Sequence, residues 1–240
     1  MIKFSVLKLG EGAISQCTRC GPTAPRVYRP TTDVLADMSR IVDTWPTGPG
    51  PNVTLCGPEP LEHPEIETLL RALHDSDIQR ACVHTGGGPL VSPSACEHIL
   101  ASGVNHIRTV LLAGDAATHD ALNDTPGSWD TAMHGIALMS QTASQSAAPL
   151  MLCGLIPVCS HNLDQLPQTI IALAGAGVRS IALDVTTLAS DPRSASWITA
   201  AVDTGMVSGV WVSPVGDDAA SYVPQPEWAL CPVELCEATL

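Results

Sequence analysis

The chain has 240 residues, of which 45% are hydrophobic and 15% charged, and its formal net charge is −13. This composition excludes an intrinsically disordered chain, because enough apolar surface is present to build a core. The acidic balance argues against nucleic acid as a partner, since it repels phosphate backbones. The length suits one α/β domain, for which we expect residues 1–213 as the core and 214–240 as an irregular tail.

The chain shows no sign of membrane insertion or secretion. No apolar run is long enough to span a bilayer. Residues 1–9 alternate like a strand instead of forming the apolar stretch of a signal peptide. We therefore expect a cytoplasmic protein without a membrane partner, and expect its nine cysteines to be reduced thiols or metal ligands.

In chain order, short β-rich runs alternate with helical patterns. The predicted strands are 2–9, 52–56, 79–85, 107–112, 150–155 and 180–185, with a short strand at 210–212. The predicted helices are 31–44, with N-caps offered by Thr31, Thr32 and Asp33, then one opening at 63–65, and others at 92–103, from 128 onward, 163–174 and 194–202. Residues 10–30 and 113–127 are predicted as loops.

Repeated strand–helix units predict a parallel sheet, either doubly wound or an open, partial barrel. In both architectures, binding and catalytic residues gather at the carboxyl ends of the strands. The unusual residues of this sequence follow strands in that way: the Cys-containing loop after the first, residues 56–60 after the second, and Gly86-Gly87-Gly88 after the third.

The loop after the first strand carries the sequence Ala13-Ile14-Ser15-Gln16-Cys17-Thr18-Arg19-Cys20. A Cys-x-x-Cys spacing lets two thiolates reach one metal ion or cluster. Thioredoxin-like redox chemistry uses the same spacing at a helix start, which the following Gly21-Pro22 disfavours. Two thiols without a role are the remaining alternative.

The second strand ends in Cys56-Gly57-Pro58-Glu59-Pro60. Backbone carbonyls and the Glu59 carboxylate at such a turn can accept hydrogen bonds from an ammonium group. A turn with a solvated glutamate is the alternative.

These two motifs, in this order, resemble the radical S-adenosylmethionine (SAM) superfamily. Its C-x3-C-x2-C hallmark lies after the first strand, and counting back from Cys17 puts the first cysteine position at Ala13. Its G-G-E-P motif resembles residues 57–60, its fifth-strand motif is matched weakly by residues 154–161, and residues 114–129 are similar to its loop after strand four. The resemblance spans about residues 2–188 and implies an α/β fold, a partial (βα)6 barrel of the radical SAM type.

The resemblance also implies a cofactor site. Three cysteines would hold a [4Fe–4S] cluster, and its open iron would bind SAM. Cleavage of SAM would give a 5′-deoxyadenosyl radical that abstracts hydrogen from a small-molecule or peptide substrate. By the match, Gly57, Glu59 and Pro60 would hold the SAM amino group, and Ile156 would lie against the adenine.

The sequence departs from the family at several of these positions. Ala13 has no ligand atom, and Arg19 stands where the family usually has an aromatic residue. Pro58 replaces a glycine and removes a backbone N–H. Val158 and His161 replace the Gly and Glu of the fifth-strand motif.

Three accounts of Ala13 stay open. In the first, the chain carries an engineered Cys→Ala change. In the second, Cys56, at the end of the second strand, completes a set of cluster ligands with Cys17 and Cys20. In the third, the chain is a natural pseudoenzyme that serves as partner subunit of an active homologue. A zinc site formed by Cys17 and Cys20 with Cys231 and Cys236 is a further alternative. His84 is expected beside the barrel interior, as a core histidine or as a substrate contact.

Overall fold

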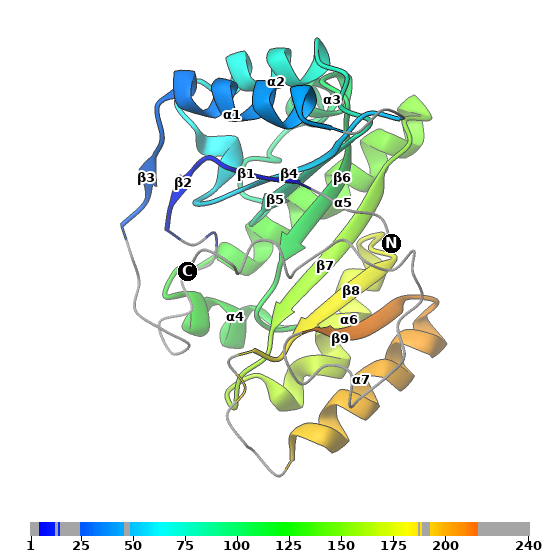
Figure 1. Cartoon of the computed structure of the whole chain (residues 1–240). Coiled ribbons are helices and arrows are strands. Elements are labelled where there is room, and N and C mark those ends of the chain that lie inside the picture. The colour runs from blue at the N-terminus through cyan, green and yellow to red at the C-terminus, as the bar shows by residue number, and fades with distance from the viewer. Residues whose placement is uncertain are drawn as a thin grey trace.

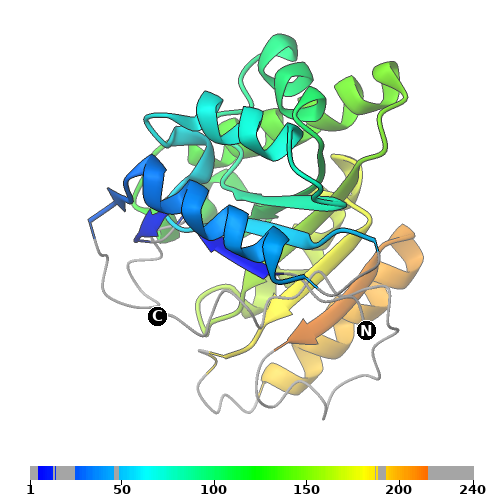
Figure 2. The same ribbon diagram turned by 45° about the horizontal axis from the view of Figure 1, so that its top comes forward.

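The computed structural model describes residues 5–12, 14, 25–45, 49–186, 188 and 193–215. Their main feature is a sheet of seven parallel strands in the order β1-β4-β5-β6-β7-β8-β9. The strands are β1 Ser5–Lys8, β4 Asn52–Cys56, β5 Arg80–Thr85, β6 Val104–Val110, β7 Met151–Pro157, β8 Ser180–Asp184 and β9 Trp211–Val215. Figures 1 and 2 show β1 and β9 at opposite ends of a strongly twisted sheet, so within the described residues the barrel is open.

Helices connect successive strands and pack on one side of the sheet (Figure 1). They are α1 Thr31–Asp43, α2 Ile66–His74, α3 Pro93–Ala101, α4 Ala116–Asn123, α5 Ser128–Ser146, α6 Leu166–Gly175 and α7 Ser194–Ser208, with short 3-10 turns η1 Pro60–Glu62 and η2 Leu163–Gln165. A two-stranded antiparallel sheet, β2 Gly10–Glu11 with β3 Val27–Tyr28, lies within the region predicted as a loop. None of the helices in the described part of the chain has the length and apolar composition to cross a bilayer.

The hydrophobic core lies between the helices and one face of the sheet. Since side chains alternate along a strand, every second residue points to the same face. Val53, Leu55, Val83 and Ile107 point to the helices and join one core cluster with residues such as Leu69 of α2. The α/β fold predicted from the strand–helix alternation is therefore confirmed, as an open parallel barrel with a seventh strand.

Two local predictions were wrong. The predicted caps Thr31, Thr32 and Asp33 lie inside α1, because the helix begins directly after Pro30, and it has no side-chain cap. Part of the loop predicted at 113–127 forms α4, whose N-terminus is capped by Asp115, which accepts a hydrogen bond from the Thr118 backbone N–H at 2.9 Å.

The expected domain boundary at residue 213 falls inside β9, which runs to Val215. Residues 216–240, which hold most of the predicted tail, lie outside the described residues.

Candidate functional site

The carboxyl ends of β4 and β5 meet at the edge of the sheet that the motifs predicted. Gly57 follows β4 directly and has a φ of +128°, a conformation that L-residues with a side chain rarely adopt. A Cβ at Gly57 would lie 3.0 Å from the backbone N and O of Gly10. The turn after β4 therefore depends on glycine both for its conformation and for the close approach of β2.

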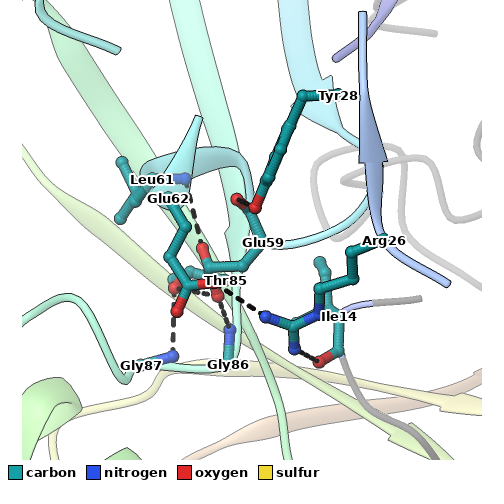
Figure 3. Close-up of polar contacts among 9 residues, drawn as sticks. All are labelled: Ile14, Arg26, Tyr28, Glu59, Leu61, Glu62, Thr85, Gly86 and Gly87. Carbon is teal, nitrogen blue, oxygen red and sulfur yellow. Dashed lines mark hydrogen bonds and ion pairs between the residues drawn. The ribbon is translucent and has the colours of Figure 1, made fainter. Parts of the chain in front are cut away.

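The Glu59 carboxylate joins the end of β4 to the end of β5 (Figure 3). Its Oε2 accepts hydrogen bonds from the Gly86 backbone N–H at 2.7 Å and from the Thr85 hydroxyl at 3.0 Å, and its Oε1 accepts one from the Leu61 N–H at 3.3 Å. Only 3% of Glu59 is exposed. We call this set of hydrogen bonds the Glu59 tie; it involves Glu59, Leu61, Thr85 and Gly86.

The environment of Glu59 changes its acidity. Burial is the dominant effect and raises its pKa to about 7, against the opposing influence of the hydrogen bonds from Gly86, Thr85 and Leu61. A carboxyl group with such a pKa exchanges its proton near neutral pH. Perturbed acidity in a buried position at the carboxyl edge of a parallel sheet is typical of functional sites.

The glycines after β5 are held against α5. Gly87 donates its N–H to the Thr85 hydroxyl at 3.0 Å, and its φ is +85°. A Cβ at Gly87 would lie 2.9 Å from the Ala132 carbonyl oxygen, and a Cβ at Gly135 only 2.3 Å from the Gly87 carbonyl oxygen. Thr85 thus links the Glu59 tie to Gly87, whose backbone is packed closely on α5.

The segment beside position 13 is anchored at the same place. Arg26 donates to the Ile14 carbonyl at 3.0 Å and pairs with Glu62 at 2.8 Å (Figure 3). A Cβ built on Gly86 would meet Ile14 Cγ2 at 3.4 Å and Glu59 Oε2 at 3.6 Å. Ile14, the neighbour of Ala13, therefore lies next to Glu59 and Gly86.

The predicted ligand residues divide into two groups. Gly57, Glu59 and Pro60 lie together at the end of β4, and Pro60 opens η1 as a buried residue. Ile156, in β7, is fully buried and belongs to the core cluster. Its predicted contact with adenine, like the predicted SAM contacts of the first group, stays a prediction.

The predicted metal ligands are described only in part. Cys56 ends β4, is 6% exposed, and is paired in register with Lys8 of β1. Cys17, Cys20 and Ala13 lie outside the described residues, as do Cys231 and Cys236 of the zinc alternative. Within the described ranges, no three His, Cys, Asp or Glu residues are grouped to hold a metal ion. By chemistry alone, two loop thiols and Cys56 would make a three-thiolate set.

A second set of hydrogen bonds, which the sequence analysis did not predict, lies after β6 and β7. The Asn162 amide donates to the carbonyls of Leu112 at 2.8 Å and Pro157 at 2.7 Å, and its oxygen accepts from the Cys159 N–H at 2.8 Å. We call this the Asn162 tie. His119 adds a bond, because its Nδ1 accepts from the Leu112 N–H at 3.1 Å, and burial lowers its pKa.

The sequence held one signal for this second set. Asn162 lies one residue after the weakly matched fifth-strand motif, and amide side chains favour turns because they bond to nearby backbone groups. His161, the residue matched to the family's glutamate, is exposed instead.

Comparison with known proteins gives two kinds of relative. No family model matches the chain. AdoMet-dependent heme synthases are similar in sequence: that of Nitratidesulfovibrio vulgaris is 26% identical over 123 residues, covering 51% of this chain and 33% of the relative, and that of Methanosarcina barkeri is 25% identical over 134 residues, covering 55% and 37%. The matched part of the chain thus corresponds to about a third of the length of these relatives.

Solved structures share the fold. SuiB of Streptococcus suis bound to S-adenosylmethionine has a TM-score of 0.66 at 14% identity, covering 91% of this chain and 52% of that one. Methylornithine synthase has a TM-score of 0.58 at 10% identity, and the match covers 92% of this chain and 68% of the synthase. The radical SAM methyltransferase TsrM of Kitasatospora setae has a TM-score of 0.56 at 10% identity, covering 75% and 34%. The motif order, the open parallel barrel and these comparisons agree, and the chain is similar to radical SAM enzymes in sequence and in fold.

Proposed function

We propose that the edge formed by the ends of β4 and β5 binds S-adenosylmethionine, and that the chain acts as a radical SAM enzyme. The Glu59 tie carries this proposal. Through its bonds to Thr85 and Gly86, one buried carboxylate fixes the turn after β4 and the glycines after β5. Ile14, next to the cysteine-loop position Ala13, lies against the same residues.

In this proposal Glu59 acts mainly by positioning the backbone. Its carboxylate already accepts three hydrogen bonds, and its carbonyl accepts one from the Tyr28 hydroxyl at 2.9 Å. The 57–60 segment is thereby held in one conformation, with Gly57 in the left-handed region. A backbone fixed in this way offers carbonyl oxygens to the ammonium group of SAM without an ordering entropy cost on binding.

We further propose that Cys56 supplies the third thiolate beside Cys17 and Cys20. Cys56 ends β4 one residue before Gly57, so a group bound there adjoins the proposed SAM segment. When bound, a [4Fe–4S] cluster supplies the electron that cleaves SAM. Ala13 offers no ligand atom, so the cysteine loop alone is one thiolate short.

A second candidate function also depends on whether Cys56 binds the cluster. If Cys56 does not complete the set, the chain holds no cluster of its own and serves as the partner subunit of an active homologue. Ala13 and the exposed His161, at a position where the family has a glutamate, favour this reading.

The substrate class follows only from the similar proteins. One neighbour was crystallised as SuiB bound to the precursor peptide SuiA, and TsrM was solved with tryptophan. We propose a small molecule or a peptide as the substrate of this chain.

Anaerobic reconstitution tests the proposal. The chain, Ala13→Cys, Cys56→Ala and the matched control Cys96→Ala, in helix α3 away from this edge, are loaded with iron and sulfide. Iron, zinc and 5′-deoxyadenosine formed from SAM are then measured. We expect cluster and product in the chain, more in Ala13→Cys, and neither in Cys56→Ala.

The remaining outcomes separate the alternatives. Product from Ala13→Cys alone contradicts the Cys56 proposal and leaves two accounts of the unaltered chain, an engineered Cys→Ala change and a partner subunit. Stoichiometric zinc that persists after iron loading favours the zinc site. Absence of cluster, SAM binding and product even in the Ala13→Cys variant contradicts the radical SAM proposal.

A further inference from the structure

The helices at the two ends of the sheet differ in the character of their outer sides. α1 packs on β1 and α7 packs on β9, so the two helices lie at opposite ends of the sheet (Figures 1 and 2). α1 and α2 contain four and two Asp, Glu, Lys or Arg residues, most of them exposed, whereas α6 contains none and α7 contains one, Asp203. A helix with one side in water normally carries charged residues on that side. α1 and α2 follow this rule, and α6 and α7 depart from it.

The exposed residues of α6 and α7 run along one side of each helix. Positions three or four apart lie on the same side of a helix, because each turn takes 3.6 residues. The two helices pack against each other, so their exposed sides adjoin. We call six of these exposed residues the α6–α7 face; they are Gln168, Ile171, Thr199, Asp203, Met206 and Val207.

Three large apolar side chains of this face are open to solvent. Ile171 is 58% exposed, Met206 68% and Val207 87%. They make up half of the six large apolar side chains that are exposed in the described part of the chain. A single exposed apolar residue is ordinary, but several on adjoining helices with almost no charge are typical of a surface that binds another protein.

The charge of the chain favours a second copy as the partner on this face. The formal net charge is −13, so two copies repel each other through most of their surface. A two-fold dimer places a patch against itself, so the patch must be complementary to itself. An apolar and nearly uncharged patch meets this condition, whereas a patch of like charges does not. A basic partner would find one carboxylate here, that of Asp203, and many more elsewhere on this acidic chain.

We propose that two copies of this chain associate through the α6–α7 face as a symmetric dimer. The longer helix, α7, has 15 residues and is therefore about 22 Å long. Two packed helices of this size form a small interface compared with the roughly 800 Å² per partner of standard complexes. We therefore expect a reversible dimer with a dissociation constant of about 10–100 μM. The face lies at the β9 end of the sheet, and its association does not depend on the proposed binding of SAM.

Sedimentation velocity over a range of about 2–500 μM tests the proposal. The full chain is compared with Ile171→Glu, Met206→Glu and Val207→Glu, each of which adds one negative charge to the face. Val91→Glu is the matched control, because Val91 is 64% exposed and precedes α3, away from this face. Circular dichroism checks that each variant is folded.

We expect the chain to pass reversibly from monomer to dimer as its concentration rises. Each face variant should raise the dissociation constant about tenfold or more, because one carboxylate from each copy would be buried at an apolar interface. Val91→Glu should change it by less than about threefold. Raising the salt concentration from about 0.1 M to about 0.5 M should strengthen association, since salt screens the repulsion between two acidic chains.

A chain that stays monomeric up to about 500 μM overturns the proposal, as does a dimer that all three face variants leave intact. Weaker association at high salt also overturns it, because ion pairs would then hold the dimer. Photo-cross-linking from p-benzoylphenylalanine placed at position 207, mapped by mass spectrometry, identifies what covers the face. Cross-links at the mass of a dimer that join two α6–α7 faces support the second copy. Cross-links within a monomer to residues 216–240 overturn it.

Discussion

The Glu59 tie and the Asn162 tie occupy the same edge of the sheet and connect loops after neighbouring strands, yet their chemistry differs. Each side chain takes part in three hydrogen bonds, and both residues are almost fully buried. Glu59 is ionisable, with a pKa raised to about 7 by burial. Asn162 is neutral at every physiological pH. The tie at the ligand motifs is therefore titratable, whereas the tie that holds the opposite loops is made by a neutral amide.

The largest expected effect belongs to the Asn162 tie. Asn162→Ala leaves the buried carbonyls of Leu112 and Pro157 and the Cys159 N–H without this partner. We expect the free energy of unfolding to fall by about 3 kcal/mol or more, equally at pH 7 and pH 8.5, where His119, whose pKa is lowered by burial, stays neutral. Urea denaturation measures it, with His161→Ala, an exposed neighbour, as the control. A loss that varies with pH would contradict the neutral character of this tie.

The Glu59 tie should show the pH dependence that the Asn162 tie lacks. Since the pKa rises from 4.5 to about 7 on folding, the contribution of Glu59 to stability is complete below about pH 4.5 and is lost as the pH rises through 7. Relative to Glu59→Gln, the chain should lose about 3 kcal/mol across this range, as an order of magnitude. Parallel unfolding curves of the two proteins between pH 4.5 and 8 would refute the raised pKa.

Thr85 sharpens the same comparison. Thr85→Val removes the hydroxyl that donates to Glu59 and accepts from the Gly87 N–H, at nearly constant volume. We expect a loss of about 2 kcal/mol at pH 8. The midpoint of the pH-dependent loss of stability should also move to higher pH. The hydrogen bond from Thr85 lowers the pKa of Glu59, so its removal raises that pKa. Thr85→Ser serves as control and should keep both the stability at pH 8 and the midpoint of the pH-dependent transition. A midpoint that moves to lower pH in Thr85→Val would show that Thr85 does not stabilise the carboxylate.

The smallest effect concerns the glycines after β5. Gly87→Ala should cost about 1–2 kcal/mol, because φ is +85° and the new Cβ would contact Ala132. Gly88→Ala should cost less than about 1 kcal/mol, since no atom lies within 4 Å of its Cβ position. Thermal unfolding of the two variants measures the difference, and equal costs would contradict the close packing of Gly87 on α5.

Much of this edge could be predicted from the sequence. The strand 52–56 has the predicted bounds, and its Gly57–Pro60 turn lies at the carboxyl edge as expected, because apolar runs and glycine or proline turns are local signals. The partners of Glu59 were not predictable, since Thr85 and Gly86 are 26 and 27 residues away and meet it only through the β4–β5 register.

The central claim is that the edge at the Glu59 tie binds SAM, and titration calorimetry with SAM on the anaerobically reconstituted chain at pH 8 tests it most directly. Glu59→Gln is the test variant, because an amide that replaces the carboxylate disrupts the bonds to Thr85 and Gly86, and Arg71→Ala on the exposed side of α2 is the control. The account predicts one SAM per chain, binding weakened about tenfold or more in Glu59→Gln, and unchanged binding in Arg71→Ala. Undetectable binding, or equal binding by all three proteins, would contradict it.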